Sequence, residues 1–127
     1  KTLGWKNIIL PVDFKFKKEM ILDIGEKTAE IFSEKLKKAR TIIWSGPMGA
    51  FEKNGFSDGT LAVARAIAKN KKAFSVIGGG ETVTFLEKHG LGGNFSFIST
   101  GGGAMLEFLA GKKLPGIEAL DNSVTGD

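Results

Sequence analysis

The sequence predicts an α/β fold, namely a Rossmann-like parallel sheet of about four strands with helices on both faces. Three observations indicate this fold. Short apolar runs alternate along the chain with longer segments whose apolar residues have helical spacing. Within each short run, apolar residues follow one another without intervening polar residues, which is typical of strands buried on both faces. Most of the 18 glycines gather where these runs end, so the chain is expected to turn sharply there.

Length and composition exclude several classes of protein. The 127 residues amount to one domain, and the 42% hydrophobic and 25% charged residues are ordinary for a soluble globular protein. No apolar run has the length of a transmembrane helix, so we expect no membrane partner. The absence of cysteine excludes disulfides and thiolate metal sites. The cytoplasm is therefore the expected location.

The net charge of +4 comes from 18 basic and 14 acidic residues. Lysines cluster at the ends of two predicted helices, in Lys35–Arg40 and Lys69–Lys72, where cations complement the helix dipole. Neither cluster contains an aromatic residue. Solvated helix ends are therefore favoured over a patch for phosphate backbones, and we expect no nucleic-acid partner.

The first elements in the chain are a strand and a helix. Asn7–Val12 has the pattern of a fully buried strand that Asp13 ends, and a lysine-rich connector, Phe14–Met20, follows. A helix is expected after Gly25, with Glu26 in its first turn. Its inward face would carry Thr28, Ile31, Phe32, Leu36 and Ala39.

A second strand and helix follow. Thr41–Trp44 is the predicted strand, and Ser45–Gly49 breaks it. Ser57 is the expected N-cap of the next helix, with Asp58 in its first turn. Its inward face would carry Leu61, Ala64, Ile67 and Ala68.

The second half of the chain repeats this order twice. Phe74–Ile77 is a short strand that stops at three glycines, and a helix runs from there to about His89, the expected C-terminal capping group. Phe95–Ile98 is the fourth strand. A last helix, covering Met105–Leu109, is stopped by Gly111. The chain from Leu114 onward is expected to be a tail.

The glycine corner Gly78–Gly80 is suited to phosphate. Glycines let a backbone come close to a ligand, and the free amides of the helix that follows face them. Parallel strands bring their carboxyl ends to one edge, so the loops Ser45–Glu52, Gly78–Thr82 and Ser99–Gly103 should converge there. Two helix starts side by side could hold the two ends of a polyphosphate, whereas a single glycine corner is usually only a turn.

Two carboxylates lie in these loops, and each has two interpretations. Glu81 could hold Mg²⁺ on the phosphates of a nucleotide, or could be a first-turn acid that stabilises the helix. Glu52 could accept hydrogen bonds from ribose hydroxyls, or could be an exposed loop residue. Neither glycine triplet completes GxGxxG, because Val83 and Leu106 occupy the third glycine position, and no Walker A motif is present.

Three motifs resemble the carboxyl-terminal, nucleotide-binding domain of phosphoglycerate kinase. They are WSGPMGAFE (Trp44–Glu52), IGGGETV (Ile77–Val83) and STGGGAMLEFLAGKKLPGIEAL (Ser99–Leu120). The segments LPVD (Leu10–Asp13) and LDIGEKT (Leu22–Thr28) are similar to landmarks upstream in the same family. The motifs span nearly the whole chain in the family's order.

The resemblance implies a role for each motif. Glu52 would contact the ribose, and Gly79, Gly80, Glu81 and Thr82 would bind the phosphates of ATP or ADP and Mg²⁺. Glu81 matches a metal-binding aspartate of the family and is one methylene longer. Ser45 stands where the family commonly has asparagine. A separate pair, Gly101 and Gly102, would be catalytic, because their amides would stabilise the phosphoryl group during transfer.

The resemblance also implies an organisation and partners. Residues 1–120 would be part of the nucleotide-binding domain of a two-domain kinase, and residues 121–127 a tail. The partners would be the nucleotide, phosphoglycerate substrates and the missing amino-terminal part of the kinase, which would be a monomer at full length. We expect the isolated chain to be inactive.

Two other hypotheses compete with a phosphoglycerate kinase of glycolysis. One is a non-catalytic nucleotide-binding or complementation fragment that needs the missing parts of the kinase. The other is an NAD-dependent dehydrogenase on a similar sheet, which the incomplete glycine fingerprints disfavour.

Overall fold

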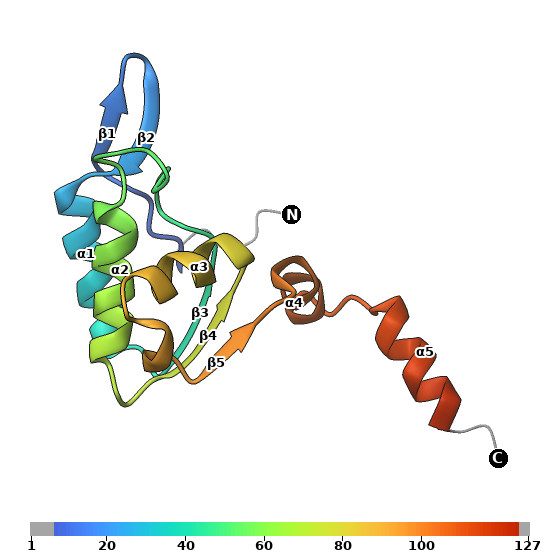
Figure 1. The fold of residues 1–127 in the computed structure, drawn as a ribbon. Coiled ribbons are helices and arrows are strands. Elements are labelled where there is room, and N and C mark those ends of the chain that lie inside the picture. Colours follow the sequence, from blue (N-terminus) through green and yellow to red (C-terminus); the bar gives the residue numbers. More distant parts are fainter. Residues whose placement is uncertain (1–6, 125–127) are drawn as a thin grey trace. The chain divides into compact units, whose positions relative to one another are not determined.

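The computed structural model describes residues 7–124 (Figure 1). The chain forms two compact units. The first unit comprises Lys1–Arg40 and Pro47–Ala73, and the second comprises Thr41–Gly46 and Phe74–Asp127. Within the described residues no helix is long and apolar enough to cross a membrane.

The first unit contains a hairpin and two helices. Strands β1 (Phe14–Lys17) and β2 (Met20–Ile24) pair antiparallel, and helices α1 (Glu26–Lys38) and α2 (Asp58–Lys69) pack against each other. The predicted helical faces are confirmed at Thr28, Ala64, Ile67 and Ala68, which are buried. The prediction that Ile31 faces inward is wrong, because this side chain is 36% exposed. Ser57 is at the N-cap position as expected, but its side chain makes no capping hydrogen bond.

The prediction of a buried strand at Asn7–Val12 is wrong. The structure assigns no strand there, and Ile8, Ile9, Leu10 and Val12 are exposed. A non-alternating apolar strand needs pairing neighbours and two covering layers. None of the strands described in residues 7–124 pairs with this segment.

The predicted connector Phe14–Met20 instead supplies β1 and the start of β2. Phe14 and Phe16 contact each other edge to face at a centroid distance of 6.4 Å. Lys18, at the turn, has φ +54°, in the left-handed region that tight hairpin turns use. Because this segment is rich in lysine, its sequence did not indicate a strand.

Asp13 caps the N-terminus of α1. Its carboxylate accepts hydrogen bonds from the backbone N–H of Lys27 (3.0 Å) and Thr28 (2.7 Å) and from the Thr28 hydroxyl. These bonds hold the pKa of Asp13 below its ordinary value, the Thr28 hydroxyl having the largest effect. A Cβ on Gly25 would lie 2.2 Å from the carboxylate, so this fit requires glycine.

Asp23 caps the N-terminus of α2. Its side chain is 1% exposed and accepts hydrogen bonds from the backbone N–H of Gly59 (3.0 Å) and Ile24 (2.9 Å). A Cβ on Gly59 or Gly49 would lie 2.3 or 2.4 Å from this carboxylate. Both helices of the first unit therefore begin on a carboxylate of the protein itself.

The second unit contains a three-stranded parallel sheet in the order β3 (Thr41–Ser45), β4 (Phe74–Gly78), β5 (Phe97–Ser99). These elements confirm three of the four predicted strands and the Rossmann-like α/β class. Helices α3 (Gly80–Lys88) and α4 (Gly102–Leu109) both pack on β4. A short 3₁₀ turn, η2 (Gly92–Asn94), lies between α3 and β5.

The prediction that these strands are buried on both faces is wrong. Burial alternates along β3, where Ile42 and Trp44 are 5% exposed and Ile43 is 46% exposed. Phe74 of β4 and Phe97 of β5 are also exposed. An uninterrupted apolar run does not reveal which of its faces is covered within the chain.

The end of the described chain also differs from expectation. The predicted stop at Gly111 is confirmed, because Gly111 has φ +76° directly after α4. The tail predicted from Leu114 is instead a helix, α5 (Pro115–Val124). Its first helical residue is Pro115, a position where a missing N–H costs nothing. Residues 125–127 lie outside the described part of the chain.

Candidate phosphate-binding site

The first corner of the candidate site follows β4. Gly78 ends the strand, Gly79 turns the chain at φ +99°, and α3 begins at Gly80. Only glycine adopts this conformation at little cost. The backbone N–H of Val83 donates to the carbonyl of Gly79 at 3.1 Å, so the helix starts immediately after the turn. The predicted strand, turn and helix are confirmed here.

The second corner follows β5 and touches the first. Gly101 is the N-cap of α4, and the backbone N–H of Met105 donates to its carbonyl at 2.8 Å. A Cβ on Gly102 would lie 2.7 Å from the Gly79 nitrogen, and one on Gly78 would lie 2.4 Å from Cε of Met105. The two helix starts therefore meet within the second unit, backbone against backbone.

Thr82 and Glu81 occupy the first turn of α3. Thr82 is fully buried, and its hydroxyl has no hydrogen-bond partner among the described residues. A Cβ at Gly79 would lie 3.7 Å from this hydroxyl oxygen. Glu81 is exposed. Buried hydroxyls are normally paired, so the Thr82 hydroxyl indicates an absent partner at this corner.

Both N-cap residues are glycines, which have no side chain to accept hydrogen bonds from the first-turn amides. In the described part of the chain, no carboxylate is hydrogen-bonded to these amides. A helix start with free amides carries partial positive charge and attracts anions. The arrangement can hold phosphate oxygens by backbone alone.

The remaining predicted residues are placed individually. Glu52 is exposed, in a turn of the first unit that the Lys53 amide closes by donating to the Ala50 carbonyl. Ser45 is the last residue of β3. His89 caps the end of α3 as expected, with Nδ1 2.8 Å from the carbonyl oxygen of Phe85.

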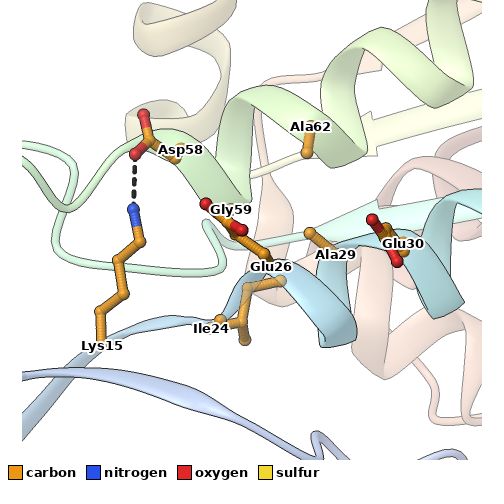
Figure 2. A pocket seen from close by; sticks show the side chains of 9 residues that line it. Lys15, Ile24, Glu26, Ala29, Glu30, Asp58, Gly59 and Ala62 are labelled. Atoms are coloured by element: carbon orange, nitrogen blue, oxygen red, sulfur yellow. Dashed lines mark hydrogen bonds and ion pairs between the residues drawn. The ribbon is translucent and has the colours of Figure 1, made fainter.

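The first unit has a cleft of about 320 Å³ near the starts of α1 and α2 (Figure 2). Figure 2 shows Lys15 reaching from β1 to the carboxylate of Asp58, and this hydrogen bond raises the pKa of Lys15. Glu26 and Glu30 add further negative charge. Three carboxylates against one lysine make this cleft unsuitable for phosphate. No three of the described acidic or histidine side chains gather as a metal site.

Two basic segments that are distant in sequence come together in the first unit. The Asn70 side-chain amide donates to the carbonyls of Leu36 (2.8 Å) and Ala39 (2.9 Å). This fixes the loop after α2 beside the end of α1. The sequence showed both segments, but the asparagine that joins them has no distinguishing local pattern.

The chain is similar to known proteins of one family. The phosphoglycerate kinase family profile matches residues 6–112. The phosphoglycerate kinase of Koribacter versatilis is 56% identical over 104 residues, 82% of this chain and 26% of that protein. That of Azorhizobium caulinodans is 52% identical over 115 residues, 88% of this chain and 29% of that protein.

The solved structures that match this chain belong to the same family. The crystal structure of phosphoglycerate kinase from Pyrococcus horikoshii matches with a TM-score of 0.73 and 50% identity, covering 80% of this chain and 25% of that one. The structure of phosphoglycerate kinase from Coxiella burnetii matches with a TM-score of 0.70 and 47% identity, covering 77% and 25%. The chain spans about a quarter of the length of these relatives, and it belongs to the phosphoglycerate kinase family.

Proposed function

We propose that this chain supplies the nucleotide-binding part of a phosphoglycerate kinase. The reaction is the reversible transfer of a phosphoryl group from 1,3-bisphosphoglycerate to ADP, which gives 3-phosphoglycerate and ATP. One observation carries the proposal: the starts of α3 and α4 touch at Gly79 and Gly102, so two sets of free amides serve one site. A nucleotide's phosphate chain presents the matching row of oxygens.

Each residue of the site has a proposed task. Gly79 and Gly80 bring backbone amides close to the nucleotide phosphates, and Thr82 adds its unpaired hydroxyl. Gly101 and Gly102 direct the amides of α4 at the phosphoryl group in transfer. Charge in such a transition state spreads over the equatorial oxygens, so fixed amide dipoles stabilise it without reorganising.

Glu81 is the proposed Mg²⁺ ligand. Mg²⁺ in nucleotide sites takes one or two carboxylates and completes its shell with phosphate oxygens and water. Glu81 meets this requirement, because it is an exposed carboxylate in the first turn of α3, next to the proposed phosphate position. When bound, the ion neutralises charge on the phosphates. Glu52 is the proposed ribose contact.

The proposed chemistry needs no general base from the protein. The acceptor is already a phosphate or carboxylate oxygen, so positioning and charge stabilisation supply the catalysis. Such kinases exclude water by closing one domain on another. We therefore propose that this chain alone is inactive. Measurable turnover by the purified chain would contradict this. The complete enzyme is proposed to be a cytoplasmic monomer of glycolysis.

The second candidate function is a non-catalytic complementation fragment, which binds nucleotide only with the rest of the kinase. The exposed apolar residues favour it, including Ile43, Phe74 and Phe97 of the sheet. Ile43 and Phe97 lie in register with the same residue of β4, and apolar side chains that gather on an exposed surface often mark a protein–protein interface. A dehydrogenase is disfavoured, and a chain that does not bind NADH would exclude it.

Calorimetric titration with Mg²⁺-ADP tests the proposed function. We expect saturable binding to the purified chain, and about tenfold weaker binding to Glu81→Ala. Glu87→Ala is the matched control, since Glu87 is an exposed glutamate near the opposite end of α3, and its affinity should equal that of the unmodified chain. Equal affinities for all three chains would contradict the role of Glu81. No binding by a chain with native circular dichroism would favour the complementation fragment.

A further inference from the structure

We propose that Asn54 is a modification site, where the chain converts asparagine to isoaspartate without an enzyme. Asn54 and Gly55 lie in the exposed loop that precedes α2. Asparagine is thermally labile, because the backbone nitrogen of the next residue can attack its side-chain amide carbon. Two groups therefore decide whether the reaction occurs here, namely the Gly55 N–H and the Asn54 side chain.

The reaction needs water as its only other reactant. The Gly55 nitrogen loses its proton and bonds to Cγ of Asn54, which closes a five-membered succinimide ring and releases the side-chain nitrogen as ammonia. Water then opens the ring at one of its two carbonyl carbons. One opening gives aspartate, and the other gives isoaspartate, whose backbone runs through the former side chain. Both products carry a carboxylate at neutral pH.

Gly55 presents an accessible nucleophile. The residue is exposed, and a Cβ built on it would meet nothing within 4 Å. Within residues 7–124 its N–H donates to no acceptor, whereas the next amide, that of Phe56, closes the turn by donating to the Lys53 carbonyl at 3.2 Å. Gly55 has φ +88° and no side chain, so the backbone can rotate toward Asn54 at little steric cost.

The Asn54 side chain is equally unrestrained. It is exposed and forms no hydrogen bond with another described residue. Asn70 is the opposite case, because its side-chain amide donates to two carbonyls, at 2.8 and 2.9 Å. Asn94 donates to the Leu91 carbonyl at 3.3 Å and precedes a phenylalanine, whose Cβ hinders ring closure. Both of these asparagines must break hydrogen bonds before they can react.

A second labile pair, Asp58 and Gly59, lies only four residues later and is protected. Aspartate before glycine can form the same succinimide by losing water. The Gly59 amide is buried, however, and donates to the Asp23 carboxylate at 3.0 Å within the first turn of α2. Its nitrogen is therefore not available for attack. The sequence contains two susceptible dipeptides, and the structure leaves one of them reactive.

The modification would change the loop that holds Glu52, and this consequence rests on the proposed function, in which Glu52 contacts the ribose. Isoaspartate adds one carbon to the backbone inside the turn that the Phe56 amide closes. It also adds a negative charge two residues from Glu52, which repels the phosphates of a nucleotide. The modified chain should therefore bind Mg²⁺-ADP more weakly.

Incubation of the purified chain at mildly alkaline pH tests the proposal, with the synthetic peptide Glu52–Asp58 treated in parallel. Mass spectrometry with peptide fragmentation measures the exchange of NH₂ for OH at each asparagine, and an isoaspartate-specific methyltransferase distinguishes isoaspartate from aspartate. We expect Asn54 to convert at a rate within about tenfold of that of the peptide. Asn70 and Asn94 should convert at least about tenfold more slowly than Asn54, since their hydrogen bonds must first break.

The variant Asn54→Gln is the matched control, because glutamine would need a larger ring and cyclises far more slowly. Its affinity for Mg²⁺-ADP should not change during incubation, whereas that of the unmodified chain should fall. Asn54 that stays intact after the peptide has converted would overturn the proposal, as would equal rates at Asn54, Asn70 and Asn94. Conversion with unchanged affinity would contradict the effect on the Glu52 loop. A fresh chain that binds no Mg²⁺-ADP would contradict only the proposed function, since conversion is measured without nucleotide.

Discussion

The helices of the two units begin in opposite ways. In the first unit, α1 and α2 begin on carboxylates from elsewhere in the chain, Asp13 and Asp23. In the second unit, α3 and α4 begin on glycines, and their first-turn amides have no carboxylate partner in the described residues. All four starts carry the same partial positive charge. The difference indicates that a carboxylate of the protein stabilises a helix N-terminus, whereas a helix N-terminus whose amides have no such acceptor is available to bind an anionic ligand.

Glycine has a different task in each unit. Gly25 and Gly59 make room for a carboxylate of the protein, since a Cβ at either position would overlap it. Gly79 and Gly102 make room for each other. The first pair therefore fixes structure, and the second leaves amides available to a ligand. Four substitutions test this contrast, starting with the largest expected effect.

Removing the carboxylate of Asp23 should have the largest effect. Asp23→Ala would leave the Gly59 amide buried without an acceptor, and we expect a loss of about 3 kcal/mol in the free energy of unfolding. Asp58→Ala, on an exposed side chain at the same helix start, should cost less than about 1 kcal/mol. Urea unfolding followed by circular dichroism measures both. Similar losses from the two substitutions would mean that Asp23 is not the essential cap.

Adding one methyl group between the two open helix starts should abolish much of the binding. Gly102→Ala places a Cβ 2.7 Å from the Gly79 nitrogen, so the corners must separate. We expect Mg²⁺-ADP to bind at least about tenfold more weakly. Gly103→Ala is the matched control, because a Cβ there meets nothing within 4 Å. Equal affinities of the two variants would show that contact between the corners is irrelevant to binding.

The cap made by Asp13 should make stability depend on pH. The pKa of Asp13 in the folded chain lies below its ordinary value of 3.8, chiefly because the Thr28 hydroxyl donates to it. Its contribution is therefore complete above about pH 4 and is lost as pH falls through the lowered folded pKa. Asp13→Asn should flatten the acid limb of the unfolding free energy. An unchanged acid limb would argue against the cap.

The exposed ion pair of Lys15 and Asp58 should matter least. The Lys15 pKa is raised by this hydrogen bond, so its contribution is present at neutral pH and is lost only as pH rises above the ordinary value of 10.5. Water and salt screen such pairs, and Lys15→Gln should change stability by less than about 1 kcal/mol. A larger loss in thermal unfolding would mean that the cleft around it stabilises the first unit.

The elements around the glycine corners could be predicted from sequence because their signals are local. An apolar run that stops at three glycines and resumes with helical spacing defines β4 and α3 within a dozen residues. The contact between Gly79 and Gly102 was expected in outline, since parallel strands bring their ends to one edge. Thr82 was expected at the site only through the family resemblance, and no local pattern indicated that its buried hydroxyl would lack a partner.

The elements that escaped prediction depend on distant partners. Asp13 caps residues 14 and 15 positions away, and Asp23 caps Gly59 from 36 positions away, so no local pattern reveals them. Their only hint is that each lies in or directly after an apolar run. The strand prediction for Asn7–Val12 was wrong for the same reason, because a buried strand needs neighbouring strands, and none in the described residues pairs with this segment.

Chemical-shift mapping tests the central contrast most directly. The ¹⁵N-labelled chain would be titrated with Mg²⁺-ADP while its backbone amides are monitored by NMR. We predict the largest shifts at Gly80, Glu81, Thr82 and Gly102, and none at Lys27, Thr28 or Gly59, whose amides already donate to carboxylates. Shifts at the starts of α1 and α2 with none at α3 and α4 would contradict the account.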